Sequence, residues 1–193
     1  RTQLTVASST AATALGYGAR ASGENALAMG SSSSSSANGS IALGTSSLAN
    51  QNNAIAIGVS SNATQVNATA MGLSALASAN RATALGADSK AIANSATAIG
   101  DRAVASNTGA IAMGTGAQAT GVDSISIGTG NIVSGQGSGA IGDPTTITGS
   151  GTYSVGNNNG TIAANNSGVF GNDNTITGAL EAVRVIGNTN TVS

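Results

Sequence analysis

Large aliphatic residues recur along the chain at a fixed spacing, and each is followed directly by glycine. These glycines occupy positions 16, 30, 44, 58, 72, 86, 100, 114, 128, 142 and 156, an unbroken spacing of 14 residues. The residue before each glycine is Leu, Met, Ile or Val, and the residue two before it is Ala or Ser. Repetition at a fixed period is the sequence signature of a repeat architecture. The register therefore predicts one structural unit for every 14 residues.

Bulky and small residues alternate inside each unit. Segments 54–58 (Ala-Ile-Ala-Ile-Gly) and 82–86 (Ala-Thr-Ala-Leu-Gly) have the period of two that is typical of a strand. A few turn-type residues follow, and then a second short stretch such as Ala-Val-Ala at 103–105. A single coil of strand, turn, strand and turn has no core of its own, whereas stacked coils pair their strands in parallel. We expect an all-β parallel solenoid (β-roll) of 14-residue coils.

The alternation also predicts which side chains face inward. Two strands that face each other across a flattened coil leave room only for small residues, so we place the Ala and Ser positions inside. The inward set then comprises Ala14, Ala28 and their equivalents, opposite Ala21, Ala49, Ala63, Ala77, Ala91, Ala105 and Ala119. The outward set comprises the residues before the glycines together with Leu27, Ile41, Ile55, Ile111 and Ile125. The reverse assignment remains open from the sequence alone. Glycine at the coil corner provides a backbone with positive φ.

The repeat divides the chain into three expected segments: a lead-in over 1–10, regular repeats over 11–142, and wider variant repeats over 143–193. The spacing of the corner glycines rises to 15 between Gly156 and Gly171, and to 16 between Gly171 and Gly187. We expect 179–184 to be a protruding insertion. The run of serines at 31–36 keeps the register, so we interpret it as a coil and not as a linker.

The composition excludes several classes of function. Aromatic residues make up 2% of the chain, charged residues 7%, and the net charge is −1, so no basic surface for nucleic acid is expected. The chain has no Cys and no His, which removes thiol nucleophiles, imidazole bases and the usual zinc ligands. We expect no enzyme activity, no catalytic or metal site and no cofactor. No apolar run is long enough for a membrane helix, so this segment is not expected to insert into a membrane directly.

The repeat resembles that of a known family. Segments 40–44 (Ser-Ile-Ala-Leu-Gly), 54–58, 109–114 and 124–128 are similar to the Ser-Val-Ala-Ile-Gly repeat of YadA-like heads, which belong to the trimeric autotransporter adhesins. The resemblance covers roughly residues 11–192. It implies a left-handed parallel β-roll that forms a homotrimer on the outer membrane of a Gram-negative bacterium. It also implies binding to host extracellular matrix or host cells, by a fragment of a larger secreted protein.

Other chemistry is less well supported. Asp88 and Asp101 follow the corner glycines of adjacent coils and could form a carboxylate pair of the kind that hydrolyses glycosides. Lys90 and Arg102 stand beside them, however, so exposed ion pairs are the simpler interpretation. The Gly-rich stretch 135–139 lacks the strand–loop–helix context of a phosphate-binding loop. An ice-binding solenoid remains an alternative because Thr13, Thr69, Thr83 and Thr97 share one position, although the isoleucines and a leucine interrupt that column. A structural spacer or fibre shaft remains a further alternative.

The expected working surface is the repetitive outer face. A long apolar stripe is rarely left exposed on a soluble monomer, so we expect other copies of the chain to cover it. Turn residues and second-strand residues then remain to contact a ligand. The candidate ligand-binding residues are Ser46, Asn62, Lys90, Arg102 and Gln118. The expected partners are matrix proteins of the collagen or fibronectin class, or the host cell surface.

Overall fold

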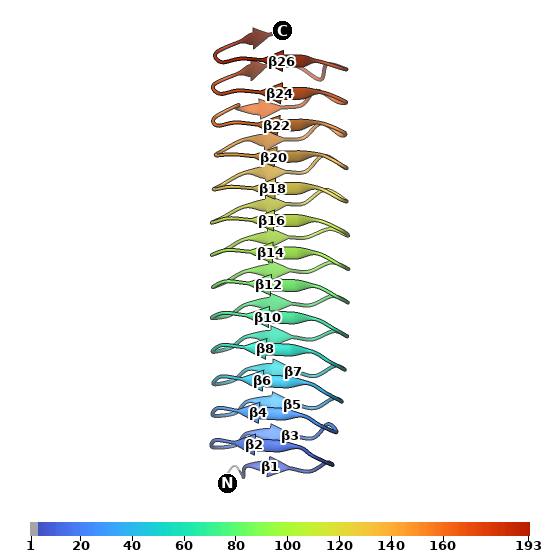
Figure 1. Ribbon diagram of the computed structural model, residues 1–193, viewed down its shortest axis with the longest axis vertical. Helices are drawn as coiled ribbons and strands as arrows, with labels where there is room; N and C mark the ends of the chain where they lie inside the picture. The colour runs from blue at the N-terminus through green and yellow to red at the C-terminus, as the bar shows by residue number, and fades with distance from the viewer. Residues whose placement is uncertain (1–3) are drawn as a thin grey trace. The chain divides into compact units, whose positions relative to one another are not determined.

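The computed structural model describes residues 4–193, in which every regular element is a strand. Residues 1–3 of the expected lead-in lie outside the described part. The chain divides into two compact units, one ending at Ser95 and one running from Ala96 to Ser193. Each coil contributes one two-residue strand and one three-residue strand (Figure 1). We call the sheets that they form the short-strand sheet and the long-strand sheet.

The first unit stacks its coils in strict register. Each strand pairs in parallel with the equivalent strand 14 residues away, as in Ala70 beside Ala56 and Ala84. Its short-strand sheet comprises β1 (Val6–Ala7), β3 (Arg20–Ala21), β5 (Ser34–Ser35), β7 (Leu48–Ala49), β9 (Asn62–Ala63), β11 (Leu76–Ala77) and β13 (Lys90–Ala91). Its long-strand sheet comprises β2 (Thr13–Leu15), β4 (Leu27–Met29), β6 (Ile41–Leu43), β8 (Ile55–Ile57), β10 (Thr69–Met71) and β12 (Thr83–Leu85).

The second unit repeats this arrangement with some longer coils. Its short-strand sheet comprises β15 (Val104–Ala105), β17 (Gln118–Ala119), β19 (Ile132–Val133), β21 (Thr146–Ile147) and β23 (Thr161–Ile162), and β25 (Thr175–Ile176) pairs separately with β27 (Thr191–Val192). Its long-strand sheet comprises β14 (Thr97–Ile99), β16 (Ile111–Met113), β18 (Ile125–Ile127), β20 (Gly139–Ile141), β22 (Tyr153–Val155), β24 (Gly168–Phe170) and β26 (Arg184–Ile186). The expected all-β parallel solenoid of 14-residue coils is confirmed.

The corner glycines are required by both conformation and space. Gly58 has φ of +126°, which a residue with a side chain rarely adopts. A Cβ added there would lie 2.5 Å from the carbonyl oxygen of Gly72, its counterpart in the next coil. Neighbouring corners therefore stack in backbone contact, and a side chain at this position would push the coils apart.

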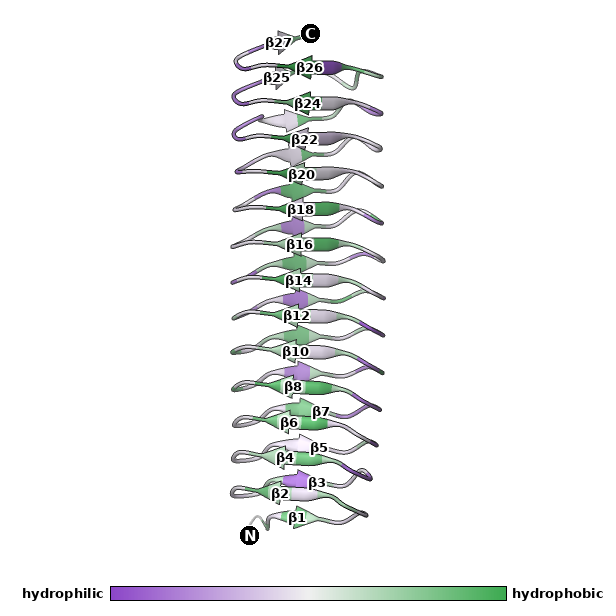
Figure 2. Cartoon of the chain, viewed as in Figure 1, coloured by the Kyte–Doolittle hydropathy of each residue, from purple (hydrophilic) through white to green (hydrophobic). Residues whose placement is uncertain are grey.

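The predicted inward positions are confirmed. Ala56, Ala70 and Ala84 in the long strands are fully buried, as are the predicted short-strand alanines from Ala21 to Ala119. Ala14, in an early coil of the stack, is half-buried. The residues on either side of each central alanine face outward; in Figure 2 strands β6, β8, β16 and β18 are green with such apolar side chains. The interior of these coils is thus lined mainly by methyl groups.

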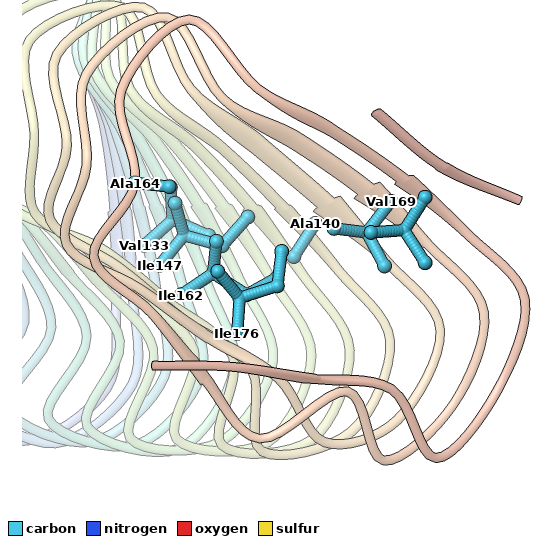
Figure 3. Packing of buried hydrophobic residues seen from close by; sticks show 8 residues of the cluster. Val133, Ala140, Ile147, Ile162, Ala164, Val169 and Ile176 are labelled. Atoms are coloured by element: carbon cyan, nitrogen blue, oxygen red, sulfur yellow. The ribbon is translucent and has the colours of Figure 1, made fainter. Parts of the chain in front are cut away.

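Coils after residue 128 contain larger inward side chains. Val133, Ile147, Ile162 and Ile176 form one file, and Ala140 and Val169 lie on the opposite side of the interior (Figure 3). Val133, Ile147 and Ile162 are fully buried, and Ile176 is nearly so. The short strands of these coils thus supply a file of branched aliphatic groups, and Val169 of β24 adds one from the opposite side.

The serine run is a coil, as expected. Ser35 lies on β5 and is fully buried together with Ser33. The Ser35 and Ser40 hydroxyls lie 2.6 Å apart and hydrogen-bond to each other, and the Ser35 hydroxyl lies 2.7 Å from the carbonyl oxygen of Ser40. A buried hydroxyl is tolerated because it has such partners.

The expectation of a protruding insertion at 179–184 is wrong for much of that segment. Leu180 and Val183 pack against the buried aliphatic file, and Arg184 begins β26. Glu181 forms a β-bridge with Asn165 and accepts hydrogen bonds from the side chains of Asn165 and Asn166. The extra residues of this coil are held down because two apolar side chains among them reach the core.

Candidate functional site: the outer surface of the coils

An apolar column runs along the outer face of the long-strand sheet in the first unit. It is formed by the residue before each corner glycine, in register from coil to coil, as in Leu43, Ile57 and Met71. Leu15 is 60% exposed and Leu85 is 41% exposed. Of the four threonines considered for ice binding, Thr69 and Thr83 are in register on adjacent strands, but Ile55 lies on the other side of Thr69.

The outer face of the long-strand sheet in the second unit is partly aromatic. Tyr153 lies beside Gly139, and a Cβ on that glycine would meet the tyrosine ring at 2.7 Å. The Tyr153 ring therefore covers the backbone of Gly139, which has no side chain of its own. Phe170 and Ile186 lie in a second column, in register with Val155, and are 48% and 84% exposed.

The three candidate residues in the first unit occupy two kinds of position. Ser46 is exposed in a corner turn with φ of 58°. Asn62 and Lys90 lie on the outer face of the short-strand sheet with Leu76 in register between them. Asn62 is half-buried because its amide donates to the carbonyl oxygen of Ser60 at 3.2 Å, whereas Lys90 is exposed. The structure thus places Asn62 and Lys90 in one column and Ser46 in another.

The two candidates in the second unit follow the same division. Arg102 is in a corner turn with φ of 55° and forms an ion pair with Asp101 at 2.8 Å. That pair is exposed, so it is expected to contribute little stability. Gln118 is half-buried on the outer face, in register with Val104 and Ile132.

The described residues offer little for acid–base or metal chemistry. No three His, Cys, Asp or Glu residues within 4–193 are placed together to hold a metal ion. Asp88 and Asp101, weighed above as a carboxylate pair, belong to different compact units. The outer surface therefore presents hydroxyl, amide and apolar groups in columns.

Sequence reasoning missed two ladders of asparagine side chains in the later coils. In the interior ladder the Asn159 Oδ1 accepts from the Asn174 backbone N–H at 3.0 Å, and Asn174 repeats this with Asn190 at 3.0 Å. In the outer ladder the Asn172 Oδ1 accepts from the backbone N–H of Asn157, one coil earlier, at 2.8 Å. The repeated Gly-Asn-x-Asn at 156–159, 171–174 and 187–190 was the available signal.

Two surface features were also missed. Thr146 and Thr161 are paired on the outer face of the short-strand sheet, and Thr175 and Thr191 are paired on β25 and β27. In the first unit, a hollow of about 270 Å³ is lined by Val66, Asn67, Asn80 and Arg81. These four residues are 14 apart in pairs, which was the signal that linked them.

The repeats match a known family along most of their length. The model of the YadA head domain repeat, which holds two copies of the repeat, matches residues 7–33, 35–61, 63–89, 91–117 and 119–143. The chain belongs to the YadA head family. Each full match spans two coils. The last match ends at residue 143, before Asn159, Asn174 and Asn190 of the interior ladder.

Membership of the YadA head family makes this an adhesin-type head domain. The search of curated proteins finds none that matches it. In the described part of the chain, no helix has the length and apolar character needed to cross a membrane.

Proposed function

We propose that this chain is the head of a trimeric surface adhesin that binds host extracellular matrix or host cells by many weak, repeated contacts. The observation that carries the proposal is the strict register of the coils, which repeats every outward position at each coil. Such columns present a similar shallow surface many times. Multivalent engagement raises avidity by about 10²–10⁴ over that of a single site.

The apolar column supports assembly into a trimer. Leu15, Leu85 and their equivalents belong to one register-matched face, and exposed apolar patches of this kind mark interaction surfaces. Two further copies of the chain would cover the face and leave the short-strand sheet and the turns outside. Light scattering is expected to give three times the chain mass of 18.1 kDa. A folded monomer at micromolar concentration would contradict this assembly.

The proposed ligand-binding surface is the short-strand face together with the corner turns. Asn62, Lys90 and Gln118 supply amide and ammonium groups on the face, and Ser46 and Arg102 supply polar groups in the turns. Extended proteins of the collagen or fibronectin class suit a surface that repeats along its length. In the longer protein, the head would stand on the outer membrane of a Gram-negative bacterium and face the host.

The test is a binding screen with the purified, oligomeric chain on a surface. Collagen, fibronectin and epithelial cells are the probes, and the thermally unfolded chain is the control. A variant that lacks the four coils between Gly58 and Gly114 keeps the register and is expected to bind much more weakly. If the intact head binds none of the probes, the spacer function is favoured instead.

The ice-binding alternative has its own measurement. Leu27, Ile41 and Ile55 are in register with one another and separate Thr13 from Thr69 and Thr83. A flat, continuous threonine array is therefore absent from this column. We expect no thermal hysteresis above that of an unrelated protein at equal concentration.

A further inference from the structure

The hollow in the first unit lies at the coil corner that precedes the long strands. Val66 and Asn67 belong to the turn before β10, and Asn80 and Arg81 to the equivalent turn before β12. The backbone N–H of Arg81 donates to the carbonyl oxygen of Val66 at 3.1 Å, which ties the two turns together. We call this site the Arg81 hollow. Its volume of about 270 Å³ is just below the range of about 300–1,000 Å³ that is usual for ligand pockets, so it suits one small ring and not a large ligand.

The charge of Arg81 is available to a ligand. Its guanidinium forms no hydrogen bond or ion pair with any residue in 4–193. Arg102, in contrast, pairs with Asp101, and the Arg184 guanidinium donates to the carbonyl oxygens of Asn166 and Val183 at 2.6 and 2.9 Å. A guanidinium presents paired donors that match the two oxygens of a carboxylate. The Arg81 hollow therefore favours an anionic ligand.

The amides of the hollow favour hydroxyl groups beside that anion. The Oδ1 of Asn67 already accepts from the Asn53 amide at 3.3 Å, which leaves the Asn67 amide N–H groups to donate. Asn80 forms no side-chain hydrogen bond among the described residues, so its amide both donates and accepts. Val66 adds an apolar surface that is 37% exposed. Vicinal hydroxyls on a ring match these amides because each hydroxyl both donates and accepts, whereas an acidic peptide side chain only accepts.

We propose that the Arg81 hollow binds the carboxylate-bearing ring of an acidic saccharide. Arg81 receives the carboxylate, Asn67 and Asn80 hydrogen-bond ring hydroxyls, and Val66 contacts the apolar face of the ring. This inference rests on the proposed adhesive function and names a ligand class for one surface of the head. An oligomer repeats the Arg81 hollow in each of its chains, so it engages a glycan-coated surface at several points.

The test uses the full chain in its own oligomeric state, immobilised on a biosensor. The probes are one polyacrylamide backbone bearing glucuronic acid, N-acetylneuraminic acid or glucose, together with polyglutamate. Glucuronic acid differs from glucose only in its carboxyl group, so this pair isolates the charge. We expect at least a tenfold preference for one acidic sugar polymer over the glucose polymer. The two acidic arms distinguish a uronic acid from a sialic acid as the source.

Matched variants separate the hollow from general charge attraction. Arg81→Gln and Arg20→Gln remove the same charge from the same unit, and the Arg20 guanidinium also lacks a partner among the described residues. Arg81→Gln is expected to weaken binding of the acidic sugar at least tenfold, and Arg20→Gln less than twofold. Asn80→Ala is expected to weaken it severalfold. Unchanged thermal melting confirms that each variant is folded.

Four outcomes would overturn the proposal. Equal losses in the two arginine variants would mean non-specific attraction, and equal binding of polyglutamate would mean an acidic peptide site. If the head binds matrix proteins or cells but no acidic sugar, the saccharide-binding role of the hollow is ruled out and the proposed adhesive function stands. If the head binds no probe in either screen, both the saccharide-binding role and the proposed adhesive function are ruled out.

Discussion

The coils over residues 13–127 have small inward side chains and those over 128–193 have larger ones, and the two sets, here the regular and the variant coils, build the same fold by different chemistry. In the regular coils the inward positions are alanines and serines, and Ser47 and Ser61 donate within their own turns to the carbonyl oxygens of Gly44 and Gly58 at 2.8 and 2.9 Å. In the variant coils, amides at the equivalent corner bond from one coil to the next, as Asn159 does with Asn174. The corner thus changes from bonds within a coil to bonds between coils.

The two regions also differ in the size of the side chains that they enclose. Ala63 and Ala77 of the regular coils correspond to Val133, Ile147 and Ile162 of the variant coils, and all are fully buried. Val133 and Ile147 lie in coils that keep the 14-residue spacing, whereas the coil of Ile162 has an additional residue. That residue is Gly160, which lies between Asn159 and β23 with φ of +58°. Along the chain, the larger inward side chains therefore appear before the longer coils do.

The largest expected effect is in the variant interior. Ile147→Ala removes a fully buried side chain and should destabilise the fold by about 2–5 kcal/mol. Chemical denaturation of the variant and the parent, at equal protein concentration, measures the difference. Ile132→Ala is the control because Ile132 faces outward on the neighbouring β19 and is 36% exposed. Equal losses would show that the aliphatic file does not carry the stability of these coils.

The interior of the regular coils should be destabilised by a larger side chain instead of a smaller one. Ala70→Leu adds a large side chain where a fully buried alanine lies between Ala56 and Ala84, and overpacking costs about 1–3 kcal/mol. Asn62→Ala, on the outer face of the adjoining β9, should have little effect. The two melting temperatures provide the comparison. If leucine at position 70 left the melting temperature unchanged, the regular coils would accommodate a large inward side chain as the variant coils do.

The sequence predicted the coil, its register and the direction of its side chains. The period of two assigns Ala56 and Ile57 to opposite faces, and the glycine spacing aligns every coil with the next. The packing of 179–184 was not predictable in this way, because its inward direction depends on contacts of Leu180 and Val183 with residues a coil away. The Arg81 hollow was not predictable from the sequence for a similar reason, because it forms between two turns of adjacent coils and neither turn has an unusual sequence.

The asparagine ladder offers a smaller, more local test. Asn159→Ala removes the acceptor for the Asn174 backbone N–H and the donor to the Gly171 carbonyl oxygen, which lie at 3.0 and 2.7 Å. Buried polar groups left without partners cost about 1–3 kcal/mol. Asn157→Ala in the exposed outer ladder is the matched control. Its Oδ1 accepts from the exposed backbone N–H of Asp143 at 3.0 Å, and water replaces that bond when the side chain is removed. If the two variants had the same melting temperature, the buried hydrogen bonds of Asn159 would contribute no more to stability than the exposed one of Asn157.

The smallest expected effect is a gain, at the one position where the interior ladder is interrupted. Asn131 accepts from the Thr145 backbone N–H at 2.7 Å, but the Thr145 hydroxyl oxygen is buried without a hydrogen-bond partner. Thr145→Asn would place an amide there, able to accept from the Asn159 backbone and to donate to the Gly156 carbonyl oxygen, as Asn159 does one coil later with Asn174 and Gly171. A net stabilisation of about 1 kcal/mol is expected, because a buried unpaired group is replaced by bonded ones. For a chain of this length that corresponds to about 2–4 °C in melting temperature. Thr145→Val, which removes the unpaired hydroxyl and adds no amide, is the control. If valine stabilises as much as asparagine, the gain comes from removing the hydroxyl, and continuity of the ladder contributes nothing at this coil.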